Sequence, residues 1–197
     1  GLITCGDKGT KDYTMTSDAL CRIRKKEQIA AANVIGVKDI RFLDYPDGYL
    51  IPDLNLRKDI TRVVRQEKPN ILVTCDPTTL FVGDNRINHP DHRAVGQATL
   101  DAVFPAAGDH LFFIELWRDE KLEPHHVREV WVSGSQQPNT IMDVTDYWQV
   151  KINALYEHKT QIGDKEEFTR KMISRIAEGS TLDTPKYVEI FRRIDLG

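Results

Sequence analysis

Two histidines and a carboxylate fall within four residues of this sequence, as His89, Asp91 and His92. Imidazole nitrogens are good ligands for zinc and related transition metals. A histidine beside such a metal can instead stabilise the oxyanion that forms when water attacks a carbonyl, and a neighbouring carboxylate can fix its tautomer. His92, His89 and Asp91 can fill these three roles in that order. Pro90 suits the first position of a helix and would fix how its neighbours are aimed.

The same residues also fit the start of a helix that carries no chemistry. His89 and Asp91 would then cap the helix and His92 would lie on its surface, because a four-residue motif does not separate the two interpretations. A catalytic zinc usually takes three protein ligands, more than this stretch provides. The chain has six histidines, and the adjacent pair His125 and His126 is predicted to lie on the surface.

The elements around this cluster place it at the edge of a sheet. The run Ile71–Cys75 is apolar and β-branched, which is typical of a buried strand. A polar loop at 76–88 follows, and a helical pattern runs from His89 to about Phe104, where Pro105 stops it. In open α/β sheets, ligands bind beyond the carboxyl ends of the strands. The cluster therefore lies where such sheets carry out chemistry.

Strand and helix patterns alternate through the first half of the chain. Apolar strands are predicted at Leu2–Cys5 and Ile40–Leu43, and helical periodicity runs through 20–34 and 56–64. This order predicts an α/β fold, with a Rossmann-like, mostly parallel sheet and helices on both faces. The loops that follow the three strands should then converge on one edge of the sheet.

The second half has a less regular pattern, which predicts an irregular α+β carboxyl-terminal part within one domain spanning residues 1–197. The elements predicted there are a strand or edge element at 111–116, strands at 127–132, 140–144 and 187–193, and helices at 145–162 and 166–178. No internal repeat, linker or low-complexity tract divides the chain.

The composition is that of an ordinary soluble globular protein. Of its 197 residues 40% are apolar and 29% charged, with a net charge of −3, which argues against a nucleic-acid partner. No apolar run reaches membrane-spanning length and no secretory signal is visible, which argues against a membrane partner. Cys5, Cys21 and Cys75 are odd in number and widely spaced, which argues against a disulfide framework. We therefore expect a cytoplasmic protein.

Several segments, taken in order, resemble one enzyme family. The stretch His89–Gly96 resembles the second signature of the LmbE-like (PIG-L) family of metal-dependent N-acetylglucosaminyl de-N-acetylases. The other matching segments are Thr4–Gly9, Arg24–Val37, Tyr45–Gly48 and Asp143–Gln161, which resemble the family's second strand and loop, its Arg-x-x-Glu helix, its Pro-Asp-Gly loop and its carboxyl-terminal helix. Together they cover nearly the whole chain.

The resemblance implies a role for each matching residue. His92 corresponds to the zinc-ligating histidine, His89 to the histidine that stabilises the tetrahedral intermediate, and Asp91 to the carboxylate behind it. Arg24 and Asp47 correspond to positions that hold the sugar or acyl end of the substrate. The implied cofactor is Zn²⁺, with another divalent metal such as Fe²⁺ as the alternative.

Four of the residues near the predicted site also fit an interpretation without a functional role. Arg24 also fits one charge of a solvated helix face, and Asp47 also fits an ordinary turn residue. His158 matches a recurring family histidine but shares a helix face with apolar residues, which favours packing. Asp76 ends a strand at the active edge, but an Asp-Pro pair there also serves a turn.

One family signature has no counterpart in this sequence. The His-Pro-Asp-Asp motif, which in the family supplies two zinc ligands and the aspartate general base, occurs nowhere among the 197 residues. The chain begins where the family's second strand would end. We therefore expect a first strand, its signature loop and a helix to precede Gly1 in the whole protein. Without them, residues 1–197 should expose an apolar sheet face, bind zinc poorly and lack activity.

The resemblance favours a zinc-dependent hydrolase that removes an acyl group, usually acetyl, from an amino sugar or a small conjugate of one. Its partner would be a small amino-sugar substrate, and the aromatic second half is compatible with a homo-oligomer. The alternative is a truncated or degenerate member that binds a sugar or serves as an assembly subunit without catalysis. A nucleotide-binding α/β domain is disfavoured because no Gly-x-Gly-x-x-Gly or phosphate loop follows a strand.

Overall fold

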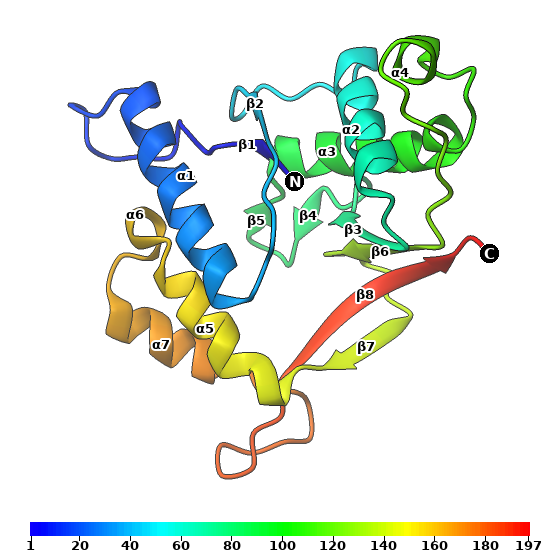
Figure 1. Ribbon diagram of the computed structural model, residues 1–197. Coiled ribbons are helices and arrows are strands. Elements are labelled where there is room, and N and C mark those ends of the chain that lie inside the picture. The colour runs from blue at the N-terminus through cyan, green and yellow to red at the C-terminus, as the bar shows by residue number, and fades with distance from the viewer. The chain divides into compact units, whose positions relative to one another are not determined.

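The computed structural model describes residues 1–197, and its elements follow the predicted alternation of strands and helices (Figure 1). The α/β class is therefore confirmed. The chain folds into two units: unit 1 comprises Gly1–Asp47 and Ile141–Glu189, and unit 2 comprises Gly48–Thr140 and Ile190–Gly197. The prediction of one domain stays a prediction. No helix combines the length and the apolar character that a membrane crossing requires.

In unit 1, two short parallel strands are joined by the first helix. β1 (Leu2–Thr4) pairs with β2 (Phe42–Tyr45), and α1 (Ser17–Val34) connects them. The helix begins where the Thr16 hydroxyl accepts a first-turn N–H at 3.2 Å. It ends before Gly36, whose φ of +75° suits glycine. The strand β2 lies slightly later in the sequence than predicted.

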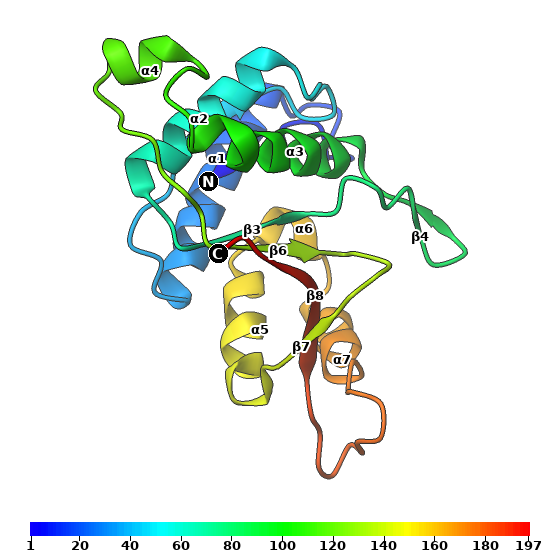
Figure 2. The same ribbon diagram turned by 90° about the vertical axis from the view of Figure 1, so that its right-hand side faces the viewer.

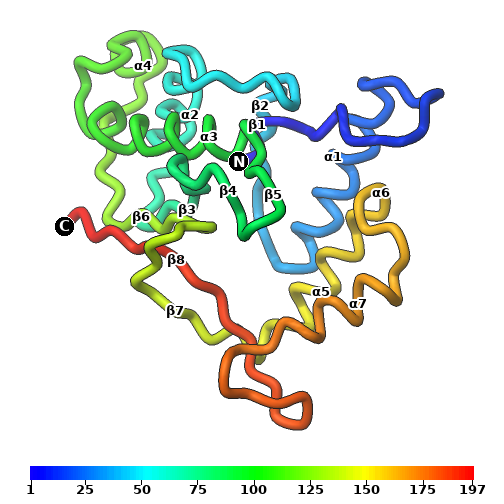
Figure 3. The backbone as a smooth tube through the Cα atoms, turned by 180° about the vertical axis from the view of Figure 1, so that it is seen from behind, coloured from blue at the N-terminus to red at the C-terminus, as the bar shows by residue number.

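The carboxyl-terminal helices of unit 1 enclose a small core. They are η2 (Thr145–Tyr147), α5 (Trp148–Tyr156), α6 (Lys159–Ile162) and α7 (Lys165–Ile173). Helix α5 packs against α1 and against α7 (Figure 3). The Trp148 ring stacks on Tyr187 with 4.3 Å between the ring centroids. The predicted helix 145–162 is interrupted at His158, whose ψ of 57° is not helical, and α7 ends earlier than predicted.

The sheet of unit 2 uses strands from distant parts of the sequence. β3 (Ile71–Cys75) pairs in parallel with β6 (Glu129–Ser133), and β6 pairs antiparallel with β8 (Val188–Asp195). The strand order is β3-β6-β8-β7, and β7 (Thr140–Asp143) belongs to unit 1 from Ile141 onward. Each of these strands overlaps a predicted strand.

The two long helices of unit 2 are α2 (Leu54–Glu67) and α3 (Pro90–Asp101), which lie side by side (Figure 2). Helix α2 begins where the Asp53 carboxylate accepts a first-turn N–H at 2.8 Å. Helix α3 packs against β3 and continues into η1 (Ala102–Ala107), in which Phe104 has extended dihedral angles. The break falls at the residue before Pro105, as the sequence predicts.

Gly96 allows α3 to approach the carboxyl end of β3. A Cβ atom added at Gly96 would lie 2.4 Å from the carbonyl oxygen of Cys75 and 3.0 Å from the nitrogen of Pro77. Only glycine permits so close an approach of helix to backbone. The contact fixes α3, which begins with the histidine cluster, against the end of the strand.

The strand β3 is less covered than predicted. Ile71 is 52% exposed and Val73 is 60% exposed, and β3 has a strand neighbour, β6, on one side only. The prediction of a strand buried on both faces is therefore wrong for residues 1–197, because the face that carries these two side chains is not covered. The expectation of an exposed apolar sheet face is confirmed.

The segment predicted as a strand at 111–116 instead wraps around a buried arginine. Arg65 is 1% exposed, and its guanidinium donates to the carbonyls of Asp109 at 2.7 Å and Phe112 at 3.1 Å. The chain curls around these bonds and continues into α4 (Ile114–Arg118). The strand prediction is wrong because Arg65, distant in sequence, satisfies carbonyls that a strand would pair with a neighbouring strand.

The polar loop between β3 and α3 contains a hairpin that the sequence does not predict. β4 (Phe81–Val82) pairs antiparallel with β5 (Arg86–Ile87), and the Asn88 N–H donates to the Leu80 carbonyl at 2.8 Å. Strands of two residues are too short to show an alternating pattern. The hairpin leads directly into the histidine cluster.

Candidate active site

His89 forms the N-cap of α3. Its Nδ1 atom accepts the backbone N–H of Asp91 at 3.2 Å. A backbone N–H can only donate, so Nδ1 carries the lone pair and the neutral imidazole carries its proton on Nε2. The side chain is exposed. His89 therefore presents an N–H donor, which suits an oxyanion rather than a metal.

His92 lies in the first turn of α3, with 5.6 Å between its ring centroid and that of His89. Its Nδ1 atom is 3.3 Å from the side-chain oxygen of Asn88. An amide oxygen can only accept, so Nδ1 carries the proton and Nε2 carries the lone pair. Metal-ligating histidines commonly have their second nitrogen held by an oxygen in this way. The two imidazoles thus present complementary groups, a donor and a metal-binding lone pair.

Asp91 is 5% exposed, and its two carboxylate oxygens are engaged by the backbone of an earlier loop. Its Oδ2 accepts the N–H of Gly48 at 2.7 Å, and its Oδ1 accepts the N–H of Leu50 at 3.2 Å. A carboxylate oxygen of Asp91 and a ring nitrogen of His89 lie within 4.8 Å of each other. The residue predicted to support His89 therefore also holds residues 48–50.

Arg24 and Glu27, the two ends of the predicted Arg-x-x-Glu motif, make structural contacts in unit 1. The Arg24 guanidinium donates to the carbonyl of Gly6 and, at 2.6 Å, to that of Gly9. The Glu27 carboxylate accepts the N–H of Thr160 at 2.8 Å and its hydroxyl at 2.7 Å. The motif thus fixes the turn after β1 and the start of α6. The role of Arg24 in substrate binding stays a prediction.

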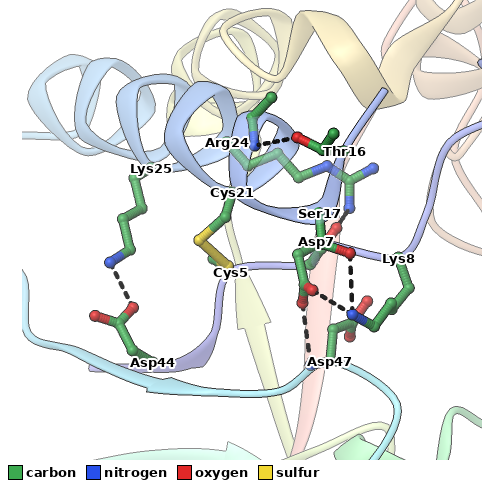
Figure 4. Close-up of a disulfide and its surroundings, with 12 residues drawn as sticks. Cys5, Asp7, Lys8, Thr16, Ser17, Cys21, Arg24, Lys25, Asp44 and Asp47 are labelled. Atoms are coloured by element: carbon green, nitrogen blue, oxygen red, sulfur yellow. Dashed lines mark hydrogen bonds and ion pairs between the residues drawn. A yellow bond between two sulfur atoms is a disulfide. The ribbon is translucent and has the colours of Figure 1, made fainter. Parts of the chain in front are cut away.

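Cys5 and Cys21 form a disulfide, with 5.3 Å between their Cα atoms (Figure 4). The odd number and wide spacing of the cysteines argued against a disulfide framework and did not predict this single bond. The end of β1 returns beneath the first turns of α1, so two cysteines that are far apart in sequence come within bonding range. The cysteines therefore no longer support the expectation of a cytoplasmic protein.

Asp47 is half-buried and lies at the end of unit 1. Its backbone N–H donates to Oδ1 of Asp7 at 3.2 Å, and Lys8 pairs with the other oxygen of Asp7 at 2.6 Å (Figure 4). Burial acts to raise the pKa of Asp7, but the Lys8 ammonium and the Asp47 amide outweigh it and hold that pKa below its ordinary value. Asp7 is therefore a charged acceptor beside Asp47.

Asp76 follows β3 and is 6% exposed. Its Oδ1 accepts the N–H of Thr78 at 2.7 Å. Burial acts to raise the pKa of Asp76, but hydrogen bonds from Thr78 and Ser135 outweigh it, so the pKa lies below its ordinary value. The side chain borders a cavity of about 460 Å³, which Ser135 and Arg192 also line. Asp76 thus holds the turn after β3, and contact with a substrate stays a prediction.

His158 borders a different cavity, of about 440 Å³, within unit 1. The cavity lies between α1 and α5, and its lining includes Ala31, Trp148 and Ala154. These neighbours are mostly apolar. The position agrees with the interpretation of His158 as a packing residue.

The predicted site residues fall into two groups. His89, Asp91 and His92 come together at the start of α3 in unit 2, whereas Arg24 and Asp47 belong to unit 1. The structure therefore brings together the three residues whose proximity the sequence already implies.

Two contributors have no assigned role in the sequence analysis. Asn88 fixes the tautomer of His92, and its position four residues before His92 could have indicated this hydrogen bond from the sequence. Asp7 binds the amide of Asp47 across 40 residues. No local pattern points to Asp7, because its partner is a backbone group on another segment.

A protein-family model described as PIG-L: GlcNAc-PI de-N-acetylase matches residues 2–103. A diacetylchitobiose deacetylase of Thermococcus kodakarensis is 32% identical over 160 residues, which are 81% of this chain and 57% of that protein. A probable N-acetyl-alpha-D-glucosaminyl L-malate deacetylase 2 of Bacillus anthracis is 27% identical over 157 residues, which are 76% of this chain and 61% of that protein. The chain thus spans about three fifths of the length of these relatives.

Among solved structures, the fold matches that of N,N'-diacetylchitobiose deacetylase from Pyrococcus horikoshii, determined in complex with its inhibitor MPG. The TM-score is 0.84 and the sequence identity 28%, and the match covers 98% of this chain and 71% of that chain. The similarity in fold therefore extends beyond the residues that the family model matches.

Proposed function

Because this chain belongs to the PIG-L family, we propose that it is part of a zinc-dependent hydrolase that removes an N-acetyl group from an N-acetylglucosamine-type sugar or conjugate. The relatives named above are deacetylases of such compounds. The substrate class is inferred from them, and the chemistry from residues of this chain.

The observation that carries the proposal is the pair of opposite tautomers at the start of α3. His89 carries an N–H donor on Nε2, and His92 carries a lone pair on Nε2 that can bind a metal. Metal-assisted amide hydrolysis can use both groups together, because a metal polarises the carbonyl and a hydrogen-bond donor stabilises the developing negative charge. The distance of 5.6 Å between the ring centroids permits both groups to face one carbonyl.

A zinc ion bound through His92 would supply Lewis acidity toward the amide carbonyl and the attacking water. The His89 N–H would donate to the oxygen of the tetrahedral intermediate. The C–N bond would then break as the proton that a general base takes from the water passes to the leaving nitrogen, and the products would be acetate and the free amine of the sugar. Fe²⁺ is the alternative metal, since imidazole binds both ions.

The donor set fits zinc in kind but not in number. A catalytic zinc takes three protein ligands, and of the two imidazoles His92 has its lone pair on Nε2, whereas His89 has its lone pair on the Nδ1 that accepts the Asp91 N–H. The Nδ1 of His89 and both oxygens of Asp91 already accept backbone N–H groups. We therefore propose that two further ligands and the general base come from a His-Pro-Asp-Asp segment outside residues 1–197, and that activity requires it.

The test is to express a longer polypeptide that includes the codons upstream of Gly1, and to compare it with residues 1–197. Bound zinc is measured by mass spectrometry, and acetate release is measured with N,N'-diacetylchitobiose and with N-acetylglucosamine. We expect zinc retention and acetate release from the longer polypeptide alone.

A matched control replaces His110, an exposed histidine of unit 2 whose ring contacts Trp117, by alanine, and this variant should retain both properties. Zinc retention without acetate release would favour the non-catalytic, sugar-binding alternative. Equal activity of both polypeptides would contradict the requirement for an upstream segment. Sedimentation of the same samples determines whether the proposed homo-oligomer forms.

A further inference from the structure

The loop that carries Asp47 is held by side-chain carboxylates rather than by a neighbouring strand. Three of its backbone N–H groups, at Asp47, Gly48 and Leu50, donate to carboxylate oxygens. The acceptors, Asp7 and Asp91, are 40 to 43 residues away in sequence. Each carboxylate belongs to the same unit as the amides that it binds.

We infer that Asp7 and Asp91 are positioning residues for the Asp47–Leu50 loop. Asp7 holds the backbone of Asp47 within unit 1, and Asp91 holds the backbone of Gly48 and Leu50 within unit 2, so each part of the loop keeps one conformation in its own unit. The inference rests on the proposed function and on the role that the family resemblance implies for Asp47, which is contact with the sugar or acyl end of the substrate. It gives Asp91 a task other than support of His89, and it gives a task to Asp7.

The unit 1 anchor is itself held in place. Asp7 lies in the turn after Cys5, and the Arg24 guanidinium binds the carbonyls at both ends of that turn, Gly6 and Gly9. The Cys5–Cys21 disulfide joins the start of the turn to α1 (Figure 4). A carboxylate on a turn fixed at three points can hold an amide in one position.

The unit 2 anchor binds the loop through both of its carboxylate oxygens. One oxygen of Asp91 binds Gly48 and the other binds Leu50, and the side chain is 5% exposed. The backbone N–H of Asp91 donates to His89. A single residue therefore fixes the tautomer of His89 through its main chain and the loop through its side chain.

Substitution by asparagine distinguishes the two anchors. Asparagine keeps one carbonyl oxygen but replaces the other oxygen by an NH₂ group that cannot accept. Asp7→Asn should therefore keep the protection of the Asp47 amide from hydrogen exchange, whereas Asp7→Ala should lower it about tenfold or more. Asp91→Asn should leave only one of the Gly48 and Leu50 amides protected, and Asp91→Ala should leave neither.

The exchange experiment uses residues 1–197 and needs no activity. Matched controls are Asp53→Ala and Asp164→Ala, which remove carboxylates that cap α2 and α7 in the two units. These variants should keep all three loop amides protected. Wild-type protection in both Asp7→Ala and Asp91→Ala would overturn the inference, as would an equal loss in the controls. If Asp91→Ala does not fold, Asp91→Asn decides the matter.

Kinetics of the longer polypeptide supply the second readout. A loop that positions a substrate contact predicts that Asp91→Asn raises KM about tenfold and changes kcat less. A carboxylate that serves His89 predicts a fall in kcat with KM unchanged, and that result would overturn the role given to Asp91. If the longer polypeptide releases no acetate, the proposed function fails, while the exchange data still decide whether the two carboxylates hold the loop.

Discussion

Replacing Cys5 and Cys21 together by serine should lower the free energy of unfolding by about 3 kcal/mol. The disulfide spans a sequence separation of 16. Closing a loop of that length removes an entropy of about 10 cal/mol/K from the unfolded chain, which is about 3 kcal/mol at 25 °C. The bond also ties the turn that carries Asp7 to α1, so the serine variant should lose order there first.

The assay is urea denaturation, followed by circular dichroism and tryptophan fluorescence. With a slope of about 2 kcal/mol per molar urea, the midpoint should fall by about 1.5 M. The control is Cys75→Ser, which removes the third cysteine and leaves the disulfide in place. Burial raises the pKa of the Cys75 thiol, so thiols are counted in denatured protein.

Two results would refute this reasoning. Denatured, unreduced wild-type protein should show one reactive thiol, and three would mean that the disulfide does not form. A serine double variant as stable as Cys75→Ser would mean that the bond does not constrain the unfolded chain. Blocking free thiols in intact cells before the protein is isolated, and then repeating the thiol count, tests whether the disulfide forms in the compartment where the protein resides.

Three further predictions address the motif and its surroundings. Gly96→Ala should lower the free energy of unfolding, because overpacking against Cys75 costs about 1–3 kcal/mol and exceeds the helix-propensity gain of about 1 kcal/mol. Urea denaturation tests this, with Gln97→Ala as the control at the neighbouring helix position. A Gly96→Ala variant more stable than the wild type would contradict the prediction. In the zinc-loaded longer polypeptide, His92→Ala should lose zinc, whereas His89→Ala should keep zinc and lose about 10²–10³ in kcat; retained zinc in the His92 variant would refute the ligand assignment. Since the folded-state pKa of Asp76 is lowered, the stabilising contribution of its carboxylate is present above about pH 4 and disappears as the pH falls through the folded-state pKa. The difference in free energy of unfolding between the wild type and Asp76→Ala should therefore become smaller in that range. A difference that stays constant with pH would contradict the lowered pKa.

Local patterns predicted both limits of α3. The helix begins at its N-cap His89, and Pro105 marks the break that follows it. Such signals work because capping and dihedral restriction depend on residues within about one turn of each other. The tautomers of His89 and His92 were not predicted, although they also depend on near neighbours, since their partners lie at most four residues away.

Predictions failed where a distant group decided the outcome. The segment at 111–116 is not a strand because Arg65 of α2 binds the carbonyl of Phe112 within it. The exposure of Val73 depends on which elements cover β3, and the strand's own apolar sequence cannot report that. In both cases the apolar residue types favour a strand, but groups distant in the sequence determine whether the strand forms and whether it is covered.

The sequence by itself determined the α/β class, the order of the matching segments and the closeness of His89, Asp91 and His92 at one helix start. Only the tertiary structure decided that Cys5 meets Cys21, that Asp7 binds the Asp47 amide and that Asp91 binds residues 48–50. The physical reason is distance along the chain. Periodicity and capping act between near neighbours, whereas these partners meet only after the chain has folded back on itself.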